Sequence, residues 1–250
     1  MRLAGHTYAY RERPLAGALD ELQSLGLTMV EVWLGHAAED AAAAARALRE
    51  RGLETAAVSA GGFYTPDSEA VPRAIELAQA LGAPVIVACV APGVLDAVVG
   101  RVPAGITLCV ENHWDQRLAT AREVRRAIDG YPGVAACVDT GHVIMAGKTP
   151  ERFVRALGAR VGHVHLKDAA LPPLHERVLG RRLRRRLLPK PEPITPGTGA
   201  LDVARLRDAL SGVGFAGRVT VEHEGTEPTA ALRRIVGEWS SSEDALASGG

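Results

Sequence analysis

The chain has 250 residues, of which 47% are apolar, and its 29 basic and 29 acidic residues cancel to a net charge of zero. This balance gives no electrostatic reason to expect binding to nucleic acid or to an anionic membrane. No apolar run reaches the ~18 residues of a membrane-spanning helix. The stretch from Met1 to His6 lacks the apolar core of a signal peptide, and the three cysteines lie inside apolar runs. We therefore expect a cytoplasmic protein with buried, reduced thiols.

Strand and helix patterns alternate along the chain. Short apolar runs predict strands over Arg2–Tyr8, Met29–Leu34, Glu54–Ser59, Pro84–Val90, Ile106–Glu111, Val134–Asp139, Val161–His165 and Arg218–Glu222. Apolar residues at helical spacing predict helices over Pro14–Leu25, Glu39–Arg51, Asp67–Leu81, Pro92–Gly100, Leu118–Ile128, Pro150–Leu157, Leu201–Leu210 and Pro228–Trp239. The last residues, Ser240–Gly250, are small and polar, and we expect them to be disordered.

This alternation predicts an α/β fold with a parallel sheet. The strand centres lie about 22 to 30 residues apart until the last step of about 57, as expected for repeated βα units. Eight such units favour a single (β/α)8 TIM barrel over residues 1–239. The alternative is a doubly wound open sheet, which would favour a glycine-rich phosphate-binding turn after the first strand, and no such turn is present there.

The long interval between the seventh and eighth predicted strands contains an insertion, residues 171–198. It is rich in proline and carries an arginine cluster from Arg181 to Arg186. We favour a solvated loop with a short basic helix. The alternative is a lid that binds a phosphate, a carboxylate or a partner, because a loop after a barrel strand leaves at the catalytic end.

Four polar residues each lie at the end of an apolar run: Glu111, Asp139, His165 and Glu222. If these runs are neighbouring parallel strands, the four side chains gather at one end of the sheet and form a site for a divalent metal. Oxygen and nitrogen ligands without thiolate suit Mn²⁺, Mg²⁺, Co²⁺ or Zn²⁺. Three carboxylates exceed the charge of one dication, so Glu111 and Glu222 can also transfer protons. A lone acid at a strand end is more often a helix cap or salt-bridge partner, but four at one face are hard to obtain by accident.

The motifs around these residues extend the pattern. They are Val110-Glu111-Asn112-His113, Val138-Asp139-Thr140-Gly141-His142, His163-Val164-His165-Leu166-Lys167-Asp168 and Val221-Glu222-His223-Glu224. With them the chain resembles the xylose-isomerase-like barrel superfamily from about Leu15 to Trp239. Within that superfamily it is most similar to the sugar phosphate isomerase/epimerase group.

The resemblance implies a role for each matching residue. Glu111, Asp139, His165 and Glu222 match the family's metal ligands, and Glu111 and Glu222 also match its acid/base pair. His142 matches a histidine that contacts substrate. The implied reaction polarises a carbonyl group on the metal. One glutamate removes the neighbouring proton, and reprotonation of the enediolate gives an isomer or epimer.

Two departures weaken a closer match to the ketohexose 3-epimerases. Those enzymes carry a second glutamate six residues after the first ligand, where this chain has Arg117. They carry an arginine six residues after the metal histidine, where this chain has Leu171. The substrate of this chain is therefore not predicted by the resemblance.

Further candidate substrate-binding residues surround the four motifs. Lys167 follows His165 by two, so strand alternation places it on the same face, where it can bind an enolate or phosphate or pair with Asp168. His6 and His113 can contact substrate or form structural hydrogen bonds. Trp33 and Trp114 follow strand ends and can line the pocket against a sugar, although core packing explains them nearly as well.

The function that these observations favour is a metal-dependent isomerase or epimerase of a small sugar or related polyhydroxy carbonyl compound. A related alternative is a dehydratase or lyase on a keto-sugar or keto-cyclitol. An apurinic-site endonuclease shares the superfamily barrel, but the predicted third strand ends in Ser59-Ala60-Gly61-Gly62 without the histidine of that class. A metal-free binding protein is a further alternative. The sequence leaves the oligomeric state open, and a homo-oligomer is one arrangement that it allows.

Overall fold

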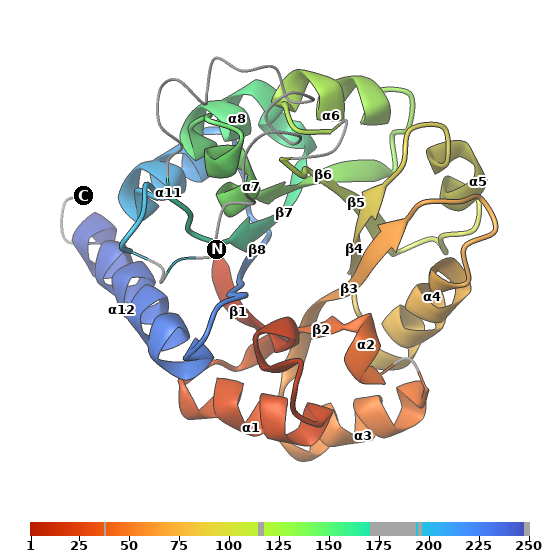
Figure 1. Cartoon of the computed structure of the whole chain (residues 1–250), viewed down its shortest axis with the longest axis horizontal. Coiled ribbons are helices and arrows are strands. Elements are labelled where there is room, and N and C mark those ends of the chain that lie inside the picture. The colour runs from red at the N-terminus through yellow and green to blue at the C-terminus, as the bar shows by residue number, and fades with distance from the viewer. Residues whose placement is uncertain (38, 115–117, 171–193, 195–196, 248–250) are drawn as a thin grey trace.

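The computed structural model describes all residues except 38, 115–117, 171–193, 195–196 and 248–250. Its centre is a closed barrel of parallel strands in the order β1 to β8, each paired with its sequence neighbours, and β1 closes on β8. Helices surround the barrel (Figure 1). The predicted TIM barrel is therefore confirmed, and the open sheet is excluded.

The strands agree closely with the predicted runs. They are β1 Arg2–His6, β2 Met29–Trp33, β3 Glu54–Phe63, β4 Val85–Val90, β5 Thr107–Glu111, β6 Val134–Asp139, β7 Val161–Leu166 and β8 Arg218–Val221. The helices of the first half are η1 Thr7–Tyr10, α1 Leu15–Ser24, α2 Leu34–Ala37, α3 Ala41–Glu50, α4 Ala70–Leu81 and α5 Leu95–Val99. Those of the second half are α6 Ala121–Ile128, α7 Thr140–Met145, α8 Pro150–Leu157, η2 Gly158–Arg160, α11 Val203–Gly212 and α12 Pro228–Ala247.

Two strand ends differ from the prediction for local reasons. The first strand ends at His6 rather than Tyr8, because the His6 Nδ1 atom accepts a hydrogen bond from the backbone N–H of Tyr8 and caps η1. The third strand continues to Phe63. Its register against β4 shifts between Ser59 and Gly62, and Gly61 takes a φ of 70°, a conformation open to glycine.

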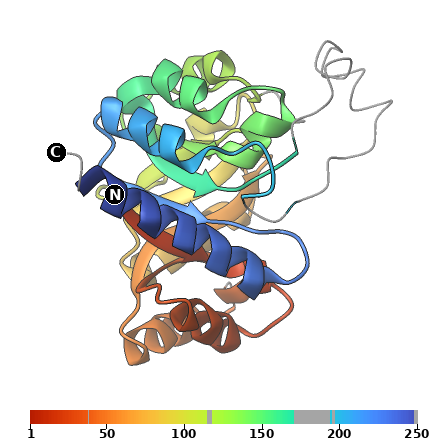
Figure 2. The same cartoon turned by 90° about the vertical axis from the view of Figure 1, so that its left-hand side faces the viewer.

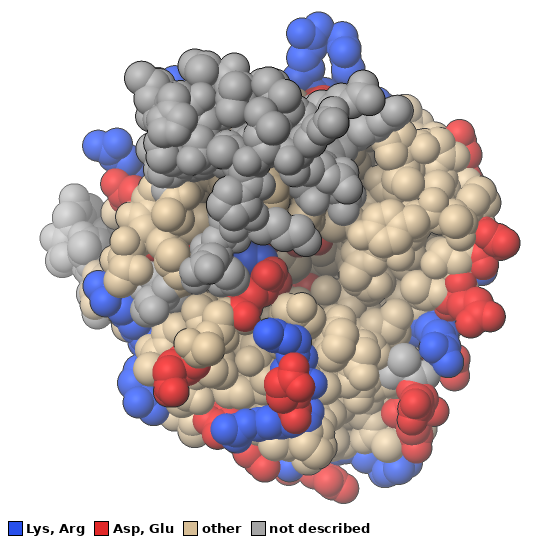
Figure 3. Space-filling view, in the orientation of Figure 1, with Lys and Arg blue, Asp and Glu red and all other residues tan. Residues whose placement is uncertain are grey.

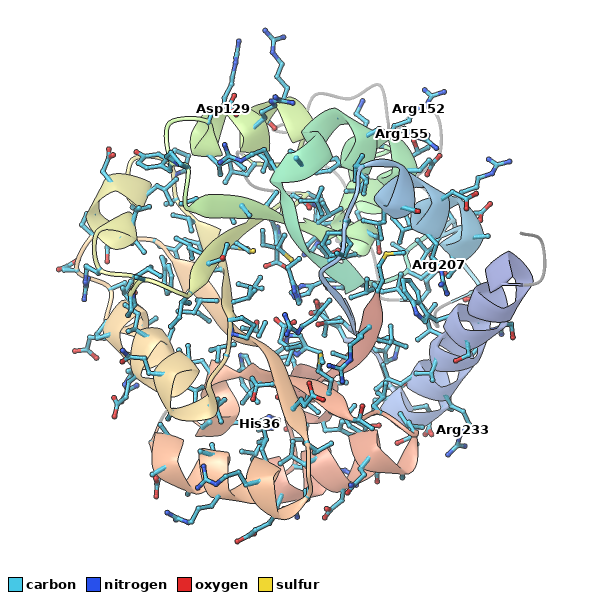
Figure 4. The ribbon with its side chains drawn as sticks, turned by 180° about the vertical axis from the view of Figure 1, so that it is seen from behind. His36, Asp129, Arg152, Arg155, Arg207 and Arg233 are labelled. Atoms are coloured by element: carbon cyan, nitrogen blue, oxygen red, sulfur yellow. The ribbon has the colours of Figure 1, made fainter. Side chains whose placement is uncertain are left out.

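The C-terminal helix extends further than expected. The helix α12 continues to Ala247, past the predicted helix end at Trp239, and the disorder expected for residues 240–250 stays a prediction. No proline or glycine interrupts residues 240–247, so nothing in the local sequence stops the helix before the glycines at the end of the chain. A buried residue in the middle of α11 contacts α12: the Arg207 guanidinium donates to the Trp239 carbonyl at 2.7 Å and lies 4.5 Å from the Trp239 ring centroid (Figures 2 and 4).

The predicted insertion over residues 171–198 lies almost wholly outside the described residues, and so do its arginine cluster and the lid hypothesis. The residues on either side of it are tied together at Asp168, a buried residue next to the end of β7. Its carboxylate accepts hydrogen bonds from the backbone N–H groups of Ala169, Gly197, Gly199 and Leu201 at 2.8–3.0 Å.

The interior of the barrel is filled by side chains that alternate along each strand. Small apolar residues occupy much of it, in two clusters: Ala4, Met29 and Ala56, and Ala57, Val85, Val87, Cys109 and Cys137. A larger core separates the barrel from the helices. Among the described residues, no helix has the length and apolar character needed to cross a bilayer.

Candidate metal centre

The strand ends bring Glu111, Asp139, His165 and Glu222 together. Glu111 ends β5, Asp139 ends β6, His165 lies near the end of β7, and Glu222 follows β8 directly. Strand register pairs Asp139 with His165 across β6 and β7, whereas Glu222 lies two residues beyond Thr220, the partner of His165 across β7 and β8. One ligand atom from each of the four side chains lies within 4.8 Å of the others. We call this group the cage.

The cage lies at the end of the barrel where the strands end. Asp139 and His165 are almost completely buried, Glu222 is 7% exposed, and Glu111 is partly buried. The space-filling view onto this end shows a hollow near its centre, in which atoms of acidic and basic side chains are visible (Figure 3).

The contacts within the cage fit a bound cation. The His165 Nδ1 atom lies 2.9 Å from Glu111 Oε1 and 3.0 Å from Glu222 Oε2. One ring nitrogen carries at most one proton, so it cannot donate to both carboxylates. The buried Asp139 Oδ2 and Glu222 Oε2 atoms have no hydrogen bond within the described part of the chain. A divalent cation would satisfy these donor atoms together, so the residues fit a metal site.

Asp139 is fixed by two neighbouring loops. Its Oδ1 atom accepts from the His142 backbone N–H at 2.7 Å and so caps α7. The Asn112 side chain donates to the Asp139 carbonyl at 3.1 Å and accepts from its N–H at 2.9 Å. These bonds leave Oδ2 as the free ligand atom. Burial raises the pKa of Asp139 to about 7 despite the opposing charge of Lys167.

Lys167 lies beside the cage, and its carboxylate partners do not include Asp168, the pairing that was one of the alternatives for it. The Nζ atom is buried against the carboxylate of Glu224 and lies 3.5 Å from Glu222 Oε1 and 3.6 Å from Asp139 Oδ2. Gly141 makes room for it, because a Cβ there would lie 2.7 Å from Lys167 Cγ.

The charged side chains of this region shift one another's pKa values. Burial would lower the pKa of Lys167, but Glu222, Asp139 and Glu224 hold it well above its ordinary value. Burial would raise the pKa of Glu222, but Lys167 and His165 hold it well below. Glu222 is therefore ionised at neutral pH.

The other predicted substrate-binding residues divide into two groups. His6 is buried, with its ring centroid 5.5 Å from that of His165. His142 is buried with Nε2 3.8 Å from Asp139 Oδ2, and its ring centroid lies 3.9 Å from that of His113. Burial keeps the pKa of His142 well below its ordinary value. These three histidines therefore lie around the cage.

The two tryptophans lie in aromatic and apolar surroundings. The Trp33 ring centroid is 5.1 Å from that of Tyr8 and 5.3 Å from that of His36. Trp114 packs against a small apolar cluster of Ile144, Met145 and Ala169. Contact of either ring with substrate stays a prediction.

Sequence reasoning missed Glu31. This residue lies in β2 between two valines, and its side chain is fully buried inside the barrel against His6, His163 and His165. An acid in an apolar strand, on the inward face, was the signal available. Cys89 and Glu224 were also missed: Cys89 Sγ donates to Glu111 Oε2 at 3.2 Å, and Glu224 pairs with Lys167.

The barrel and its cage define a TIM-barrel protein with a polar, carboxylate-rich centre at the strand ends. The chain belongs to the xylose isomerase-like TIM barrel family, whose model matches residues 19–241. No curated protein sequence matches the chain.

Solved structures with the same fold include enzymes of several activities. The chain is similar to 3-keto-D-glucoside 4-epimerase from E. coli, with a TM-score of 0.74 and 18% identity over 96% of this chain and 99% of that one. It is similar to an L-ribulose 3-epimerase, with a TM-score of 0.68 and 17% identity over 100% and 98% of the two chains. A probable 3-DHS dehydratase from Bacillus anthracis has a TM-score of 0.71 and 13% identity over 94% and 97%. At these identities, the likeness establishes the shared fold.

Proposed function

We propose that the protein is a divalent-metal-dependent isomerase or epimerase that acts on a small sugar or a related polyhydroxy carbonyl compound. The observation that carries this proposal is the convergence of three carboxylates and one imidazole in the cage. Family membership and the epimerases of the same fold support it.

Glu111, Asp139, His165 and Glu222 would hold the metal. When bound, the metal would supply Lewis-acid polarisation of the substrate carbonyl. Mn²⁺, Mg²⁺, Co²⁺ and Zn²⁺ all suit this ligand set.

Two glutamates would move the proton. Glu111 comes from β5 and Glu222 follows β8, so they approach His165 from strands on either side of β6 and β7. One would remove the proton next to the carbonyl, and the other would return a proton. Lys167 keeps Glu222 ionised and so ready to accept a proton.

Hydrogen exchange in deuterated water tests the reaction. The protein, loaded with Mn²⁺ and in parallel with Zn²⁺, would be incubated with a panel of keto-sugars and keto-cyclitols and followed by NMR. For the diamagnetic measurement, Mn²⁺ would be removed before the spectra are recorded. We expect deuterium at the carbon next to the carbonyl and formation of an isomer or epimer. The absence of exchange on every substrate with metal present would contradict the proposal.

A dehydratase is the second candidate, because a probable dehydratase shares the fold over nearly the whole chain. The same glutamates would remove the proton, and a neighbouring hydroxyl would leave as water. The NMR experiment separates the two, since loss of water gives an unsaturated product. An endonuclease is not favoured: β3 contributes no histidine, and nicking of an abasic duplex would be needed to restore that alternative.

A further inference from the structure

We propose that Glu31 is a positioning residue that holds the His165 ring with its Nδ1 lone pair directed into the cage. The proposal deepens the metal centre and rests on the proposed function only for the presence of a metal. Glu31 does not belong to the cage, and its role would be exerted through His165.

Glu31 crosses the barrel interior to reach His165. It comes from β2, whereas His165 comes from β7, and β1 and β8 lie between these strands in the barrel. The Oε1 atom of Glu31 lies 3.0 Å from His165 Nε2, and Oε2 lies 2.8 Å from His163 Nε2. Each oxygen therefore has one imidazole partner at hydrogen-bond distance.

A buried carboxylate needs donors at both oxygens. Glu31 is 0% exposed, and its two oxygens face rings that are at most 2% exposed, so the ring nitrogens are the donors at hand. The His165 Nε2–H group is then the donor to Oε1. A metal-bound imidazole is neutral and has only one N–H group, so with a metal in the cage this bond would leave His165 Nδ1 without a proton.

The Nδ1 atom faces the ligand atoms of the cage and lies at hydrogen-bond distance from Glu111. It lies between Glu111 Oε1 at 2.9 Å and Glu222 Oε2 at 3.0 Å. A carboxylate that accepts from the outer nitrogen of a metal-bound histidine fixes the tautomer and makes the ring a stronger ligand. The geometry gives Glu31 this function and assigns Nδ1, rather than Nε2, as the ligand atom.

His163 is a matched comparison on the same strand. It lies two residues before His165 and is fully buried. Its Nε2 atom lies at hydrogen-bond distance from Glu31 Oε2 and lies 2.9 Å from Thr220 Oγ1. Its Nδ1 atom is buried without a hydrogen-bond partner among the described residues. The same acid therefore orients two rings, of which only one faces the cage.

The wild-type protein gives the first test. ¹⁵N-labelled protein loaded with Zn²⁺ would be examined by NMR correlation of ring nitrogens and carbon-bound protons. We expect His165 to show a protonated Nε2 and a metal-bound Nδ1. A metal-bound Nε2 would overturn the proposal even if the enzyme turns over substrate, and absence of metal binding would overturn both the proposal and the proposed metal centre. The expected tautomer without isomerase activity would support this inference and count against the proposed function.

Two substitutions at Glu31 then measure its effect on metal affinity. Glu31→Leu replaces the carboxylate with an apolar side chain and so removes both acceptor oxygens. Glu31→Gln keeps one carbonyl acceptor but removes the charge. We expect Co²⁺ affinity, followed by visible absorption, to fall about 10–100-fold for Glu31→Leu, with a smaller fall for Glu31→Gln. Wild-type affinity in a folded Glu31→Leu variant would overturn the proposal. If circular dichroism shows that Glu31→Leu is unfolded, the proposal is judged by the Co²⁺ affinity of Glu31→Gln and by the His165 tautomer in the wild-type protein.

His163→Gln is the control. The glutamine amide can still donate to Glu31. The substitution changes the same buried hydrogen-bond network, but at a position two residues before the cage residue His165. We expect a change in Co²⁺ affinity of less than about threefold, because His163 does not face the cage. A loss as large as that of Glu31→Leu would show a general structural effect and overturn the specific role of Glu31.

Discussion

Two successive layers of inward side chains on β5 to β8 have opposite chemistry. The outer layer is the cage, Glu111, Asp139, His165 and Glu222, and the inner layer, two residues earlier on each strand, is Cys109, Cys137, His163 and Thr220. The inner layer has two cysteines on β5 and β6 that pack in an apolar cluster, and its His163 and Thr220 are hydrogen-bonded to each other. Cys137 also lies with its Sγ atom within 4.8 Å of ligand atoms of Glu111 and His165. Within the described part of the chain, Asp139 Oδ2 and Glu222 Oε2 of the outer layer are buried without a hydrogen bond, as is the Nδ1 atom of His163 in the inner layer. The comparison indicates that binding capacity lies in the outer layer and packing in the inner one.

The largest expected effect is on proton transfer in the outer layer. Glutamine has the size of glutamate but cannot exchange the proton, so Glu111→Gln and Glu222→Gln should each lower turnover by roughly a thousandfold. The measurement is the rate of deuterium incorporation, with circular dichroism to show an intact fold. Glu54→Gln, at the exposed beginning of β3, is the control and should keep wild-type activity. Near-normal turnover in either cage variant would contradict the acid/base assignment.

The second effect is the pH dependence of stability in the metal-free protein. Burial raises the folded-state pKa of Asp139 to about 7 from an ordinary value of 3.8. Its contribution to stability is therefore fully present below about pH 4 and is lost as the pH rises through about 7, a change of at most about 4 kcal/mol. Asp139→Asn removes this ionisation.

Urea unfolding with a chelator between pH 4 and 8 measures that change. The stability of Asp139→Asn relative to wild type should increase with pH across this range. At pH 4 the folded wild-type carboxyl is protonated and uncharged, like the amide of Asp139→Asn. Comparing the two proteins at this pH therefore shows whether the substitution itself disturbs the fold. If the difference in stability between the two proteins does not change with pH, the pKa of Asp139 is not raised in the folded state, and the prediction is contradicted.

Metal binding should stabilise the folded chain by a smaller amount. A ligand at a hundredfold excess over its Kd contributes about 2.7 kcal/mol, which corresponds to a rise of about 5–10 °C in Tm for a chain of this size. Differential scanning fluorimetry with Mn²⁺ or Zn²⁺ against chelator measures it. His165→Asn should show little of this rise, and an undiminished rise in that variant would place the metal elsewhere.

The smallest effect belongs to the inner layer. Cys109 is 0% exposed in an apolar cluster, so Cys109→Ala should cost about 1 kcal/mol of stability through lost packing. Turnover and metal affinity should stay at wild-type values, as measured by urea unfolding and the exchange assay. A strong loss of activity would remove the distinction between the two layers.

Local sequence was sufficient for most of the fold. The apolar runs before Glu111, Asp139 and Glu222 predicted strands that the structure contains, because buried parallel strands need continuous apolar residues. The end of β1 was harder to predict, since it depends on a hydrogen bond between His6 and Tyr8. The extension of α12 past Trp239 was missed, because polar composition alone does not exclude a helix.

The candidate site was only partly predictable. Its four cage residues could be found because each follows a strand, and parallel strands place their ends together. The partner of Lys167 could not be found in this way: the adjacent Asp168 binds backbone N–H groups of a loop, and Glu224 takes its place. Lys167 and Asp168 both follow the end of β7, yet their side chains reach different partners, so sequence proximity was misleading here.

The sequence by itself determined the alternation of strands and helices, and it identified which polar residues stand at strand ends. These features depend on local periodicity and on the residue types themselves. Only closure of the barrel brought Glu31 within 3.0 Å of a histidine that lies 134 residues later, and placed Lys167 among three carboxylates. Such contacts depend on the register of every intervening strand, and a change of one residue in any of them would turn these side chains to the other face.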